Sequence, residues 1–301
     1  MTAEAQRDVA LSPAGVETRS RAKDFRRVFF SNRLALFGTV VMTIFVLAAI
    51  FAPLVAPYDP LAQDLTAKFA PPSLAHPLGR DELGRDILSR IIYGARVSLT
   101  AGLAAVAFST VVGTTIGLVA GYAGRWADSV LMRLMDILLA FPSILLAIVV
   151  VSILGQGLTN AMLAVGIVYV PQIARVVRSA VISVRGRDYV EAERALGASH
   201  LHIIRAAILP NSMAPLIVQA TLTLATAILD IAALSFLGLG AQPPTPEWGA
   251  MLTSAFQSGY GVFVEGQHAI LFPGIAIALA VLSVNFIGDG LRDALDPRHR
   301  R

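Results

Sequence analysis

The stretch VSLTAGLAAVAFSTVVGTTIGLVAGYAG, residues 97–124, contains no Asp, Glu, Lys or Arg in 28 consecutive positions. A helix needs about 20 mostly apolar residues to cross the hydrocarbon core of a bilayer. The stretch therefore predicts a transmembrane helix. Gly113, Gly117 and Gly121 stand at four-residue spacing within it, and small residues on one stripe let helix backbones approach closely. Whether this packing serves a pore or a generic bundle, we expect the helix to face protein more than lipid.

The composition of the whole chain agrees with a membrane protein. Of its 301 residues, 55% are hydrophobic and only 15% are charged, whereas soluble domains carry about 25% charged residues. A soluble globular protein is therefore excluded. The chain has no cysteine, which excludes disulfides, thiolate metal sites and cysteine nucleophiles.

Other windows without Asp, Glu, Lys or Arg, outside residues 97–124, locate the remaining spans. The window 137–174 is too long for one crossing, and it contains the turn-like sequence LGQGLTN at 154–160, so we divide it there. We expect the first span to be a retained helix rather than a signal peptide. The prediction is an all-α integral membrane protein with six transmembrane helices. They cover residues 34–55, 98–121, 130–153, 159–175, 212–236 and 268–289.

The basic residues predict the orientation of the chain. With six spans, 18 of the 24 Lys and Arg residues fall on the side of the termini, and five fall on the other side. Basic residues accumulate in cytoplasmic segments of membrane proteins. Both termini are therefore expected in the cytoplasm. The same rule accounts for the net charge of +4, so no nucleic-acid partner is expected.

Charged and polar residues inside spans are candidates for a solute path, because they are costly in lipid. Arg133 and Asp136 are three apart and can form a structural ion pair, although Asp136 also fits a path. Asp230 lies deeper in the fifth span and could either line the path or bond to a neighbouring helix. Asn285 could contact solute, but a role in closing the sixth span is expected more strongly.

Residues 82–97 precede the second span on the opposite side from the termini. Leu83, Ile87, Leu88, Ile91, Ile92 and Tyr93 give this segment an amphipathic helical pattern. It could lie in the membrane interface, or it could be a connector helix packed on the domain. His200 and His202 lack the neighbouring ligands of a metal site, so no metal is expected.

The cytoplasmic segment between the fourth and fifth spans has the pattern of a docking element. Asp188 and Glu191 predict a capping box at the start of a short helix, and Gly197 predicts its end. A second helical stretch should then run to Leu209 and Pro210. A short capped helix outside the membrane suits docking rather than catalysis.

This segment resembles the coupling loop of binding-protein-dependent ABC importer permeases. Glu191-Ala192-Glu193, Gly197 and Leu209-Pro210 have the spacing of that loop. Glu193 stands where Ala is usual, and Ala207 stands where Ile is usual. Segments 76–86, 234–240, 243–249 and 288–297 are similar to the peptide and nickel branch of these permeases. The resemblance covers residues 25–297 and is strongest to the second permease subunit of dipeptide and oligopeptide importers.

The resemblance implies a type I importer permease fold in the bacterial cytoplasmic (inner) membrane. It implies a heterodimer with a homologous second permease subunit, two cytoplasmic ATPase subunits that bind ATP and Mg²⁺, and an extracytoplasmic substrate-binding protein. The implied regions are a cytoplasmic leader at 1–33, a first span with an external segment at 34–97, a core at 98–290 with a coupling helix at about 188–197, and a tail at 291–301. The implied coupling residues are Asp188, Glu191, Ala192, Gly197, Leu209 and Pro210.

The two lysines of the chain indicate whether it can bind the ATP that drives transport. A phosphate-binding loop needs Gly-Lys-Ser/Thr, but the chain has only Lys23 and Lys68, and neither stands in that context. We therefore expect no enzyme and no cofactor in this chain, and translocation of short peptides energised by partner subunits. Nickel, glutathione or another small solute remains open as the cargo. A passive channel or an ion-coupled transporter is the rival class, and a membrane enzyme is the third.

Overall fold

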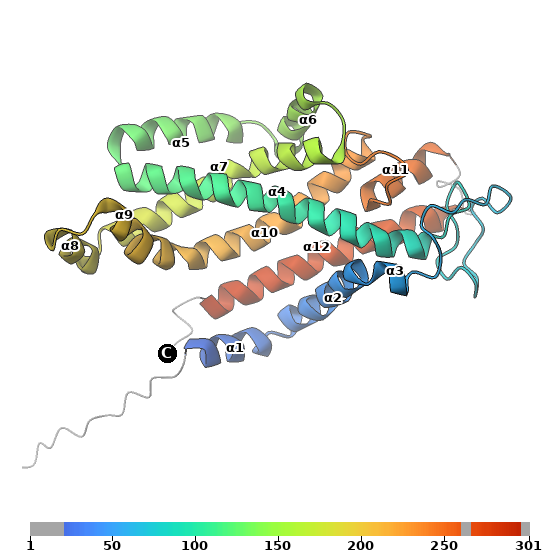
Figure 1. Cartoon of the computed structure of the whole chain (residues 1–301), viewed down its shortest axis with the longest axis horizontal. Coiled ribbons are helices and arrows are strands. Elements are labelled where there is room, and N and C mark those ends of the chain that lie inside the picture. Colours follow the sequence, from blue (N-terminus) through green and yellow to red (C-terminus); the bar gives the residue numbers. More distant parts are fainter. Residues whose placement is uncertain (1–20, 260–265, 296–301) are drawn as a thin grey trace, which may run out of the picture.

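The computed structural model describes residues 21–259 and 266–295, and every named element within these residues is a helix. In Figure 1 the long helices run side by side along the longest axis of the molecule. The elements are α1 (Arg21–Ser31), α2 (Arg33–Ile50), α3 (Ala52–Val55), α4 (Ile87–Ala123), α5 (Arg125–Leu139), α6 (Ser143–Leu154), α7 (Leu158–Arg185), α8 (Asp188–Ala195), α9 (His200–His202), the π-helix η1 (Ile203–Ile208), α10 (Leu209–Phe236), α11 (Trp248–Gln257) and α12 (Gln267–Leu295).

Five helical segments of the described residues are long and apolar enough to cross a membrane. They are α2, α4, α7, the continuous segment His200–Phe236 and α12. The pair α5 and α6 meets the same requirement only when it is taken together. The predicted all-helical membrane fold is therefore confirmed, and the sixth span depends on counting the bent pair as one crossing.

The third span differs in shape from the straight helix predicted at 130–153. Helices α5 and α6 meet at 94° across a break of three residues that ends at Pro142. Proline has no amide hydrogen to donate and disfavours the helical conformation in the residue before it, so a helix stops there. The apolar window showed no charge at this point and concealed the bend.

The segment 82–97 is neither a separate interfacial helix nor a separate connector helix. Helix α4 begins at Ile87 and continues without a break through the predicted second span to Ala123. Arg85 and Arg90, which stand between the apolar positions of the amphipathic pattern, are only 3% and 2% exposed. Asp86 starts the helix, because its Oδ2 accepts hydrogen bonds from the amide and the hydroxyl of Ser89, both at 2.7 Å.

The glycine stripe of α4 packs against α7, as the spacing predicted. A Cβ atom on Gly117 would lie 2.6 Å from the carbonyl oxygen of Ala174, and one on Gly113 or Gly121 would come within 2.8 Å of Ile173 or Val181. The two helix backbones can approach this closely only because side chains are absent there. This helix face therefore contacts protein.

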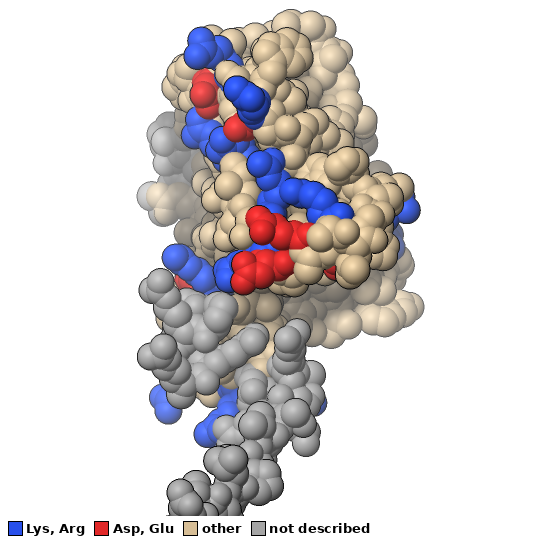
Figure 2. All heavy atoms as spheres, turned by 90° about the vertical axis from the view of Figure 1, so that its left-hand side faces the viewer, with Lys and Arg blue, Asp and Glu red and all other residues tan. Residues whose placement is uncertain are grey.

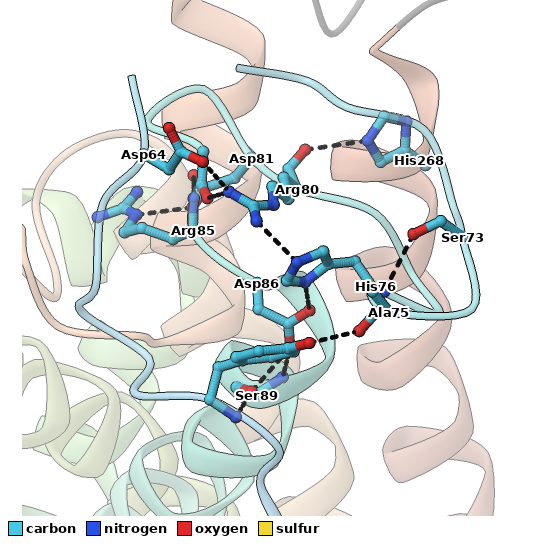
Figure 3. A network of polar contacts seen from close by, with 12 residues as sticks. Asp64, Ser73, Ala75, His76, Arg80, Asp81, Arg85, Asp86, Ser89 and His268 are labelled. Atoms are coloured by element: carbon cyan, nitrogen blue, oxygen red, sulfur yellow. Dashed lines mark hydrogen bonds and ion pairs between the residues drawn. The ribbon is translucent and has the colours of Figure 1, made fainter. Parts of the chain in front are cut away.

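The two ends of the bundle differ. Helix α8 lies at one end, together with the start of α1 and the last turns of α12 (Figure 1). The loop of residues 56–86 lies at the opposite end and is held by the polar contacts drawn in Figure 3, which we call the loop network. Arg80 donates to Asp64 at 2.7 Å, and His268 on α12 contacts the carbonyl oxygen of Arg80 at 3.0 Å.

Buried charge lies at the centre of the loop network. Asp81 Oδ2 is 2.7 Å from Arg85 Nε and 3.2 Å from Arg90 Nε. His76 lies between Arg80 and Asp86, with each ring nitrogen 2.8 Å from its partner. Because a guanidinium can only donate, Nε2 of His76 accepts from Arg80 and Nδ1 faces the Asp86 carboxylate.

Candidate coupling element and translocation path

Helix α8 forms at the predicted position, but it begins differently. It covers Asp188–Ala195, and Arg187 occupies the N-cap with no side-chain hydrogen bond. The predicted capping box is therefore wrong. Asp188 and Glu191 instead lie in the first turn, where carboxylates interact favourably with the positive end of the helix dipole.

The end of α8 agrees with the sequence. Gly197 has φ +82°, a backbone conformation that L side chains rarely adopt. Its amide donates to the carbonyl oxygen of Arg194 at 3.1 Å, and the amide of Ala198 donates to that of Glu193 at 3.0 Å. A left-handed residue that satisfies the last helix carbonyls is a common helix terminator. A Cβ atom at Gly197 would meet nothing within 4 Å, so only the backbone conformation requires glycine here.

One side of residues 188–203, which we call the α8 segment, is fixed to the bundle. Val190 is fully buried and packs in a cluster with Val177 and Val181 of α7 and Ile203 of η1. The hydroxyl of Tyr122 at the end of α4 lies 2.7 Å from His200 Nδ1. The segment is therefore packed on α4, α7 and η1.

The other side of the α8 segment is free. Leu196 is 88% exposed, and the side chains of Tyr189 and Leu201 are also exposed. Of the predicted coupling residues, Leu209 is partly buried at the start of α10. The remaining five, Asp188, Glu191, Ala192, Gly197 and Pro210, are exposed. Figure 2 views this end of the molecule and shows acidic and basic side chains gathered on it. Sequence reasoning did not single out Tyr189, Leu196 or Leu201, although exposed apolar residues beside a capped loop helix would have been a signal.

The three predicted path residues do not come together. Asp136 on α5 is exposed and pairs with Arg175 of α7, so the predicted pairing with Arg133 is wrong. Asn285 is partly buried in α12, ten residues before the end of that helix, so it does not close the helix. Asp230 is partly buried in α10 and accepts a 2.7 Å hydrogen bond from the hydroxyl of Tyr169 on α7. No hydrogen bond between any two of the three is found within 21–259 and 266–295.

The residues of α10 form a polar stripe that the sequence analysis missed. Ser212, Gln219, Thr223, Thr226 and Asp230 follow one another at spacings of seven, four, three and four residues. These spacings place them on one face of a helix. The stripe begins buried at Ser212 and opens at Thr226, which is exposed, and at Asp230. The spacing could have been read from the sequence as a signal.

No group of three or more His, Cys, Asp or Glu side chains that could hold a metal ion occurs within the part of the chain that the structure describes. His200 contacts Tyr122 rather than His202.

Comparisons with known proteins identify the family. Residues 113–301 match the family model described as "Binding-protein-dependent transport system inner membrane component", and residues 20–72 match the "N-terminal TM domain of oligopeptide transport permease C". A dipeptide transport system permease protein of Alkalihalophilus pseudofirmus is 52% identical over 89% of this chain and 86% of its own length. A di/tripeptide transport system permease protein of Pseudomonas aeruginosa is 50% identical over 93% of each chain.

A solved structure resembles the fold. A chain of the MetNI methionine ABC transporter, in an inward-facing conformation, matches 70% of this chain and 98% of its own length with a TM-score of 0.54. At 23% identity this likeness concerns the fold alone. The family model covers more than half of the chain, and the relatives cover nearly all of it. The chain therefore belongs to the binding-protein-dependent transport system inner membrane components, and it is a multi-pass membrane permease.

Proposed function

We propose that this chain is one of two permease subunits of an ATP-binding cassette importer and that it moves short peptides into the cytoplasm. The observation that carries the proposal is the α8 segment, which is fixed to the bundle on one side and exposes apolar side chains on the other. The names of its relatives, which are dipeptide and di/tripeptide permeases, support the choice of cargo.

The α8 segment is the proposed docking site for the ATPase subunits. Exposed apolar residues such as Leu196 and Tyr189 gain binding free energy when a partner covers them. Glu191, Ala192 and Gly197 shape the helix that enters the partner. Val190 and the Tyr122–His200 contact then carry movement of the partner to the spans.

Energy is proposed to come from the partners. Neither Lys23 nor Lys68 stands in a phosphate-binding loop, so ATP and Mg²⁺ belong on the ATPase subunits. The unequal distribution of basic residues supports a cytoplasmic location for the α8 end and for both termini. The loop of residues 56–86 then faces outward, where a substrate-binding protein would deliver the peptide.

The polar stripe of α10 is the proposed contribution to the solute path. A carboxylate facing hydrocarbon is costly, so residues such as Asp230 face protein or a water-filled path. A homologous second permease subunit would cover the stripe and complete the path. Asp136 is a weaker candidate for the solute path, because it lies on α5 and pairs with Arg175. Asn285 is also a weaker candidate, because it lies on α12 rather than on the polar stripe of α10.

Substitution of Gly197 by Pro tests the coupling role. Proline fixes φ near −65°, whereas Gly197 has φ +82°, so the end of α8 must rearrange. We expect Gly197→Pro to insert into the membrane but to lose ATP-driven peptide uptake by about tenfold or more in proteoliposomes that contain the whole importer. Uptake at the wild-type rate would contradict the docking role.

Gly197→Asn is the matched control. Asn is among the non-glycine residues that adopt the left-handed conformation most readily, so α8 should keep its end. Uptake should stay within about twofold of the wild-type rate. Peptide uptake without any ATPase subunit would instead support a channel or an ion-coupled transporter, and import of nickel but not of peptides would change the cargo.

A further inference from the structure

Asp230 is an acidic residue in a helix that spans the membrane, and Tyr169 is its one hydrogen-bond partner among the residues that the structure describes. Its Oδ2 accepts the hydrogen bond from Tyr169, and no partner of its Oδ1 is found within 21–259 and 266–295. Tyr169 is only 4% exposed, so its ring is fixed by the packing of α7. The phenol orients the carboxylate, but it cannot neutralise the negative charge.

The basic residues of the adjoining helix are engaged elsewhere. Arg175 pairs with Asp136, Arg178 pairs with Asp128, and Arg185 donates to the carbonyl oxygens of Gly121 and Tyr122. No Lys or Arg of the described ranges forms an ion pair with Asp230. The site therefore has an oriented carboxylate and lacks a fixed counter-charge.

The position of Asp230 suits a group that passes along α10. Asp230 lies six residues before the last residue of α10, which is about 9 Å along the helix axis from the end opposite α8. Thr226 lies one turn further along the same face, and its side chain is exposed. The Thr226 hydroxyl donates to the carbonyl oxygen of Thr223 at 3.0 Å, so its oxygen can still accept a hydrogen bond one helical turn from Asp230.

We infer that Asp230, Tyr169 and Thr226 form a transient binding site for the α-ammonium group of a peptide in transit. The inference rests on the proposed function. An ammonium group has three donors and no acceptor, and the three side chains offer a carboxylate oxygen and two hydroxyl oxygens. Charge-assisted hydrogen bonds to a carboxylate are stronger than neutral ones. With a single charge, the site binds the ammonium group and still releases it, as a transport path requires.

The test compares two cargoes in liposomes that contain the complete importer and its binding protein. One cargo is a labelled dipeptide, and the other is its des-amino analogue, in which hydrogen replaces the α-ammonium group. Asp230→Asn should lower the maximal uptake rate of the dipeptide by about tenfold and leave that of the analogue within about twofold. Asp230→Glu should retain most of the dipeptide rate.

Two controls separate this site from a structural role. Thr115→Val changes an exposed polar residue of α4 whose hydroxyl donates to the carbonyl oxygen of Val111 in its own helix, and it should leave both rates unchanged. Tyr169→Phe should lower the dipeptide rate less than Asp230→Asn does, because the carboxylate remains. Equal loss of both cargoes in Asp230→Asn, or no loss of the dipeptide, would overturn the inference.

If the wild-type importer takes up no analogue, the dipeptide uptake rates of Asp230→Asn and Asp230→Glu test the proposed site. A loss in Asp230→Asn that Asp230→Glu restores supports the site, and equal rates in the two variants overturn it. The proposed function fails separately, when the wild-type importer moves neither cargo. A failure of this site leaves wild-type dipeptide uptake intact.

Discussion

The loop network and the α8 segment lie at opposite ends of the bundle and treat charge in opposite ways. In the loop network, Asp81 is buried and pairs with Arg85 and with Arg90, which are buried too. In the α8 segment, Asp188 and Glu191 are exposed. Buried pairs fix a loop but leave no charge for a partner, whereas exposed side chains add little stability and remain available. The loop network therefore suits a rigid structure, and the α8 segment suits contact with a partner.

Removal of the central carboxylate of the loop network should lower stability more than any other change considered at either end of the bundle. Asp81→Asn leaves two buried guanidinium groups without their shared partner, and breaking a buried ion pair costs about 3–5 kcal/mol. We expect a large fall in the melting temperature of the purified protein in detergent. The matched change at the other end, Asp188→Asn, removes an exposed carboxylate and should alter stability by no more than about 0.5 kcal/mol.

If Asp81→Asn melted like the wild type, the loop network would not stabilise the fold, and the contrast between the two ends would fail. A stability loss in Asp188→Asn as large as that in Asp81→Asn would mean that the exposed charges of the α8 segment stabilise the fold as much as the buried charges of the loop network do.

Two glycines with positive φ, one at each end of the bundle, should differ in their tolerance of alanine by a smaller amount. Gly84 in the loop network and Gly197 after α8 have φ +73° and +82°, so alanine strains the backbone at both positions by about 1–2 kcal/mol. A Cβ atom at Gly84 would also lie 1.9 Å from the carbonyl oxygen of Asp64, whereas nothing lies within 4 Å at Gly197.

We therefore expect Gly84→Ala to be the more destabilising of the two by about 1–3 kcal/mol, which is the usual range for overpacking. Thermal unfolding of the two variants side by side measures the difference. Equal losses would mean that the loop moves away from the added methyl group, and that the loop network is less rigid than its contacts indicate.

The sequence predicted features that depend on local pattern. Long apolar runs located the spans, because hydrocarbon tolerates little else, and the four-residue glycine spacing predicted the packing of α4. Gly197 was predicted as the end of α8, because few other residues adopt its conformation. These features need no knowledge of which helices are neighbours.

Features that depend on neighbours were missed. The partner of Asp136 proved to be Arg175, 39 positions away, rather than Arg133 on the same helix. Arg85 and Arg90 had polar identities but buried positions, since Asp81 compensates them only after the loop has folded. Tyr169 lies in an apolar run, and its hydroxyl gained a role only when α7 packed against α10. The coupling and path assignments remain predictions.

The smallest expected effect concerns pH within the loop network itself. Burial, together with the neighbouring Asp81, raises the pKa of the Glu82 carboxyl. The folded chain therefore binds this proton more readily than the unfolded chain, and the stability that Glu82 contributes rises as the pH falls through the raised pKa. Hydrogen bonds from Thr66 and Arg80 lower the pKa of Asp64, whose contribution is lost as the pH falls.

The two carboxylates should therefore give opposite trends when melting temperatures are measured between neutral and acidic pH. The melting temperature of the wild type minus that of Glu82→Gln should increase on acidification, because only the wild type gains a proton there. The wild type minus Asp64→Asn should decrease, because only the wild type loses a favourable charge. Trends of the same sign would show that Glu82 is solvated like Asp64, and that the buried part of the loop network ends at Asp81.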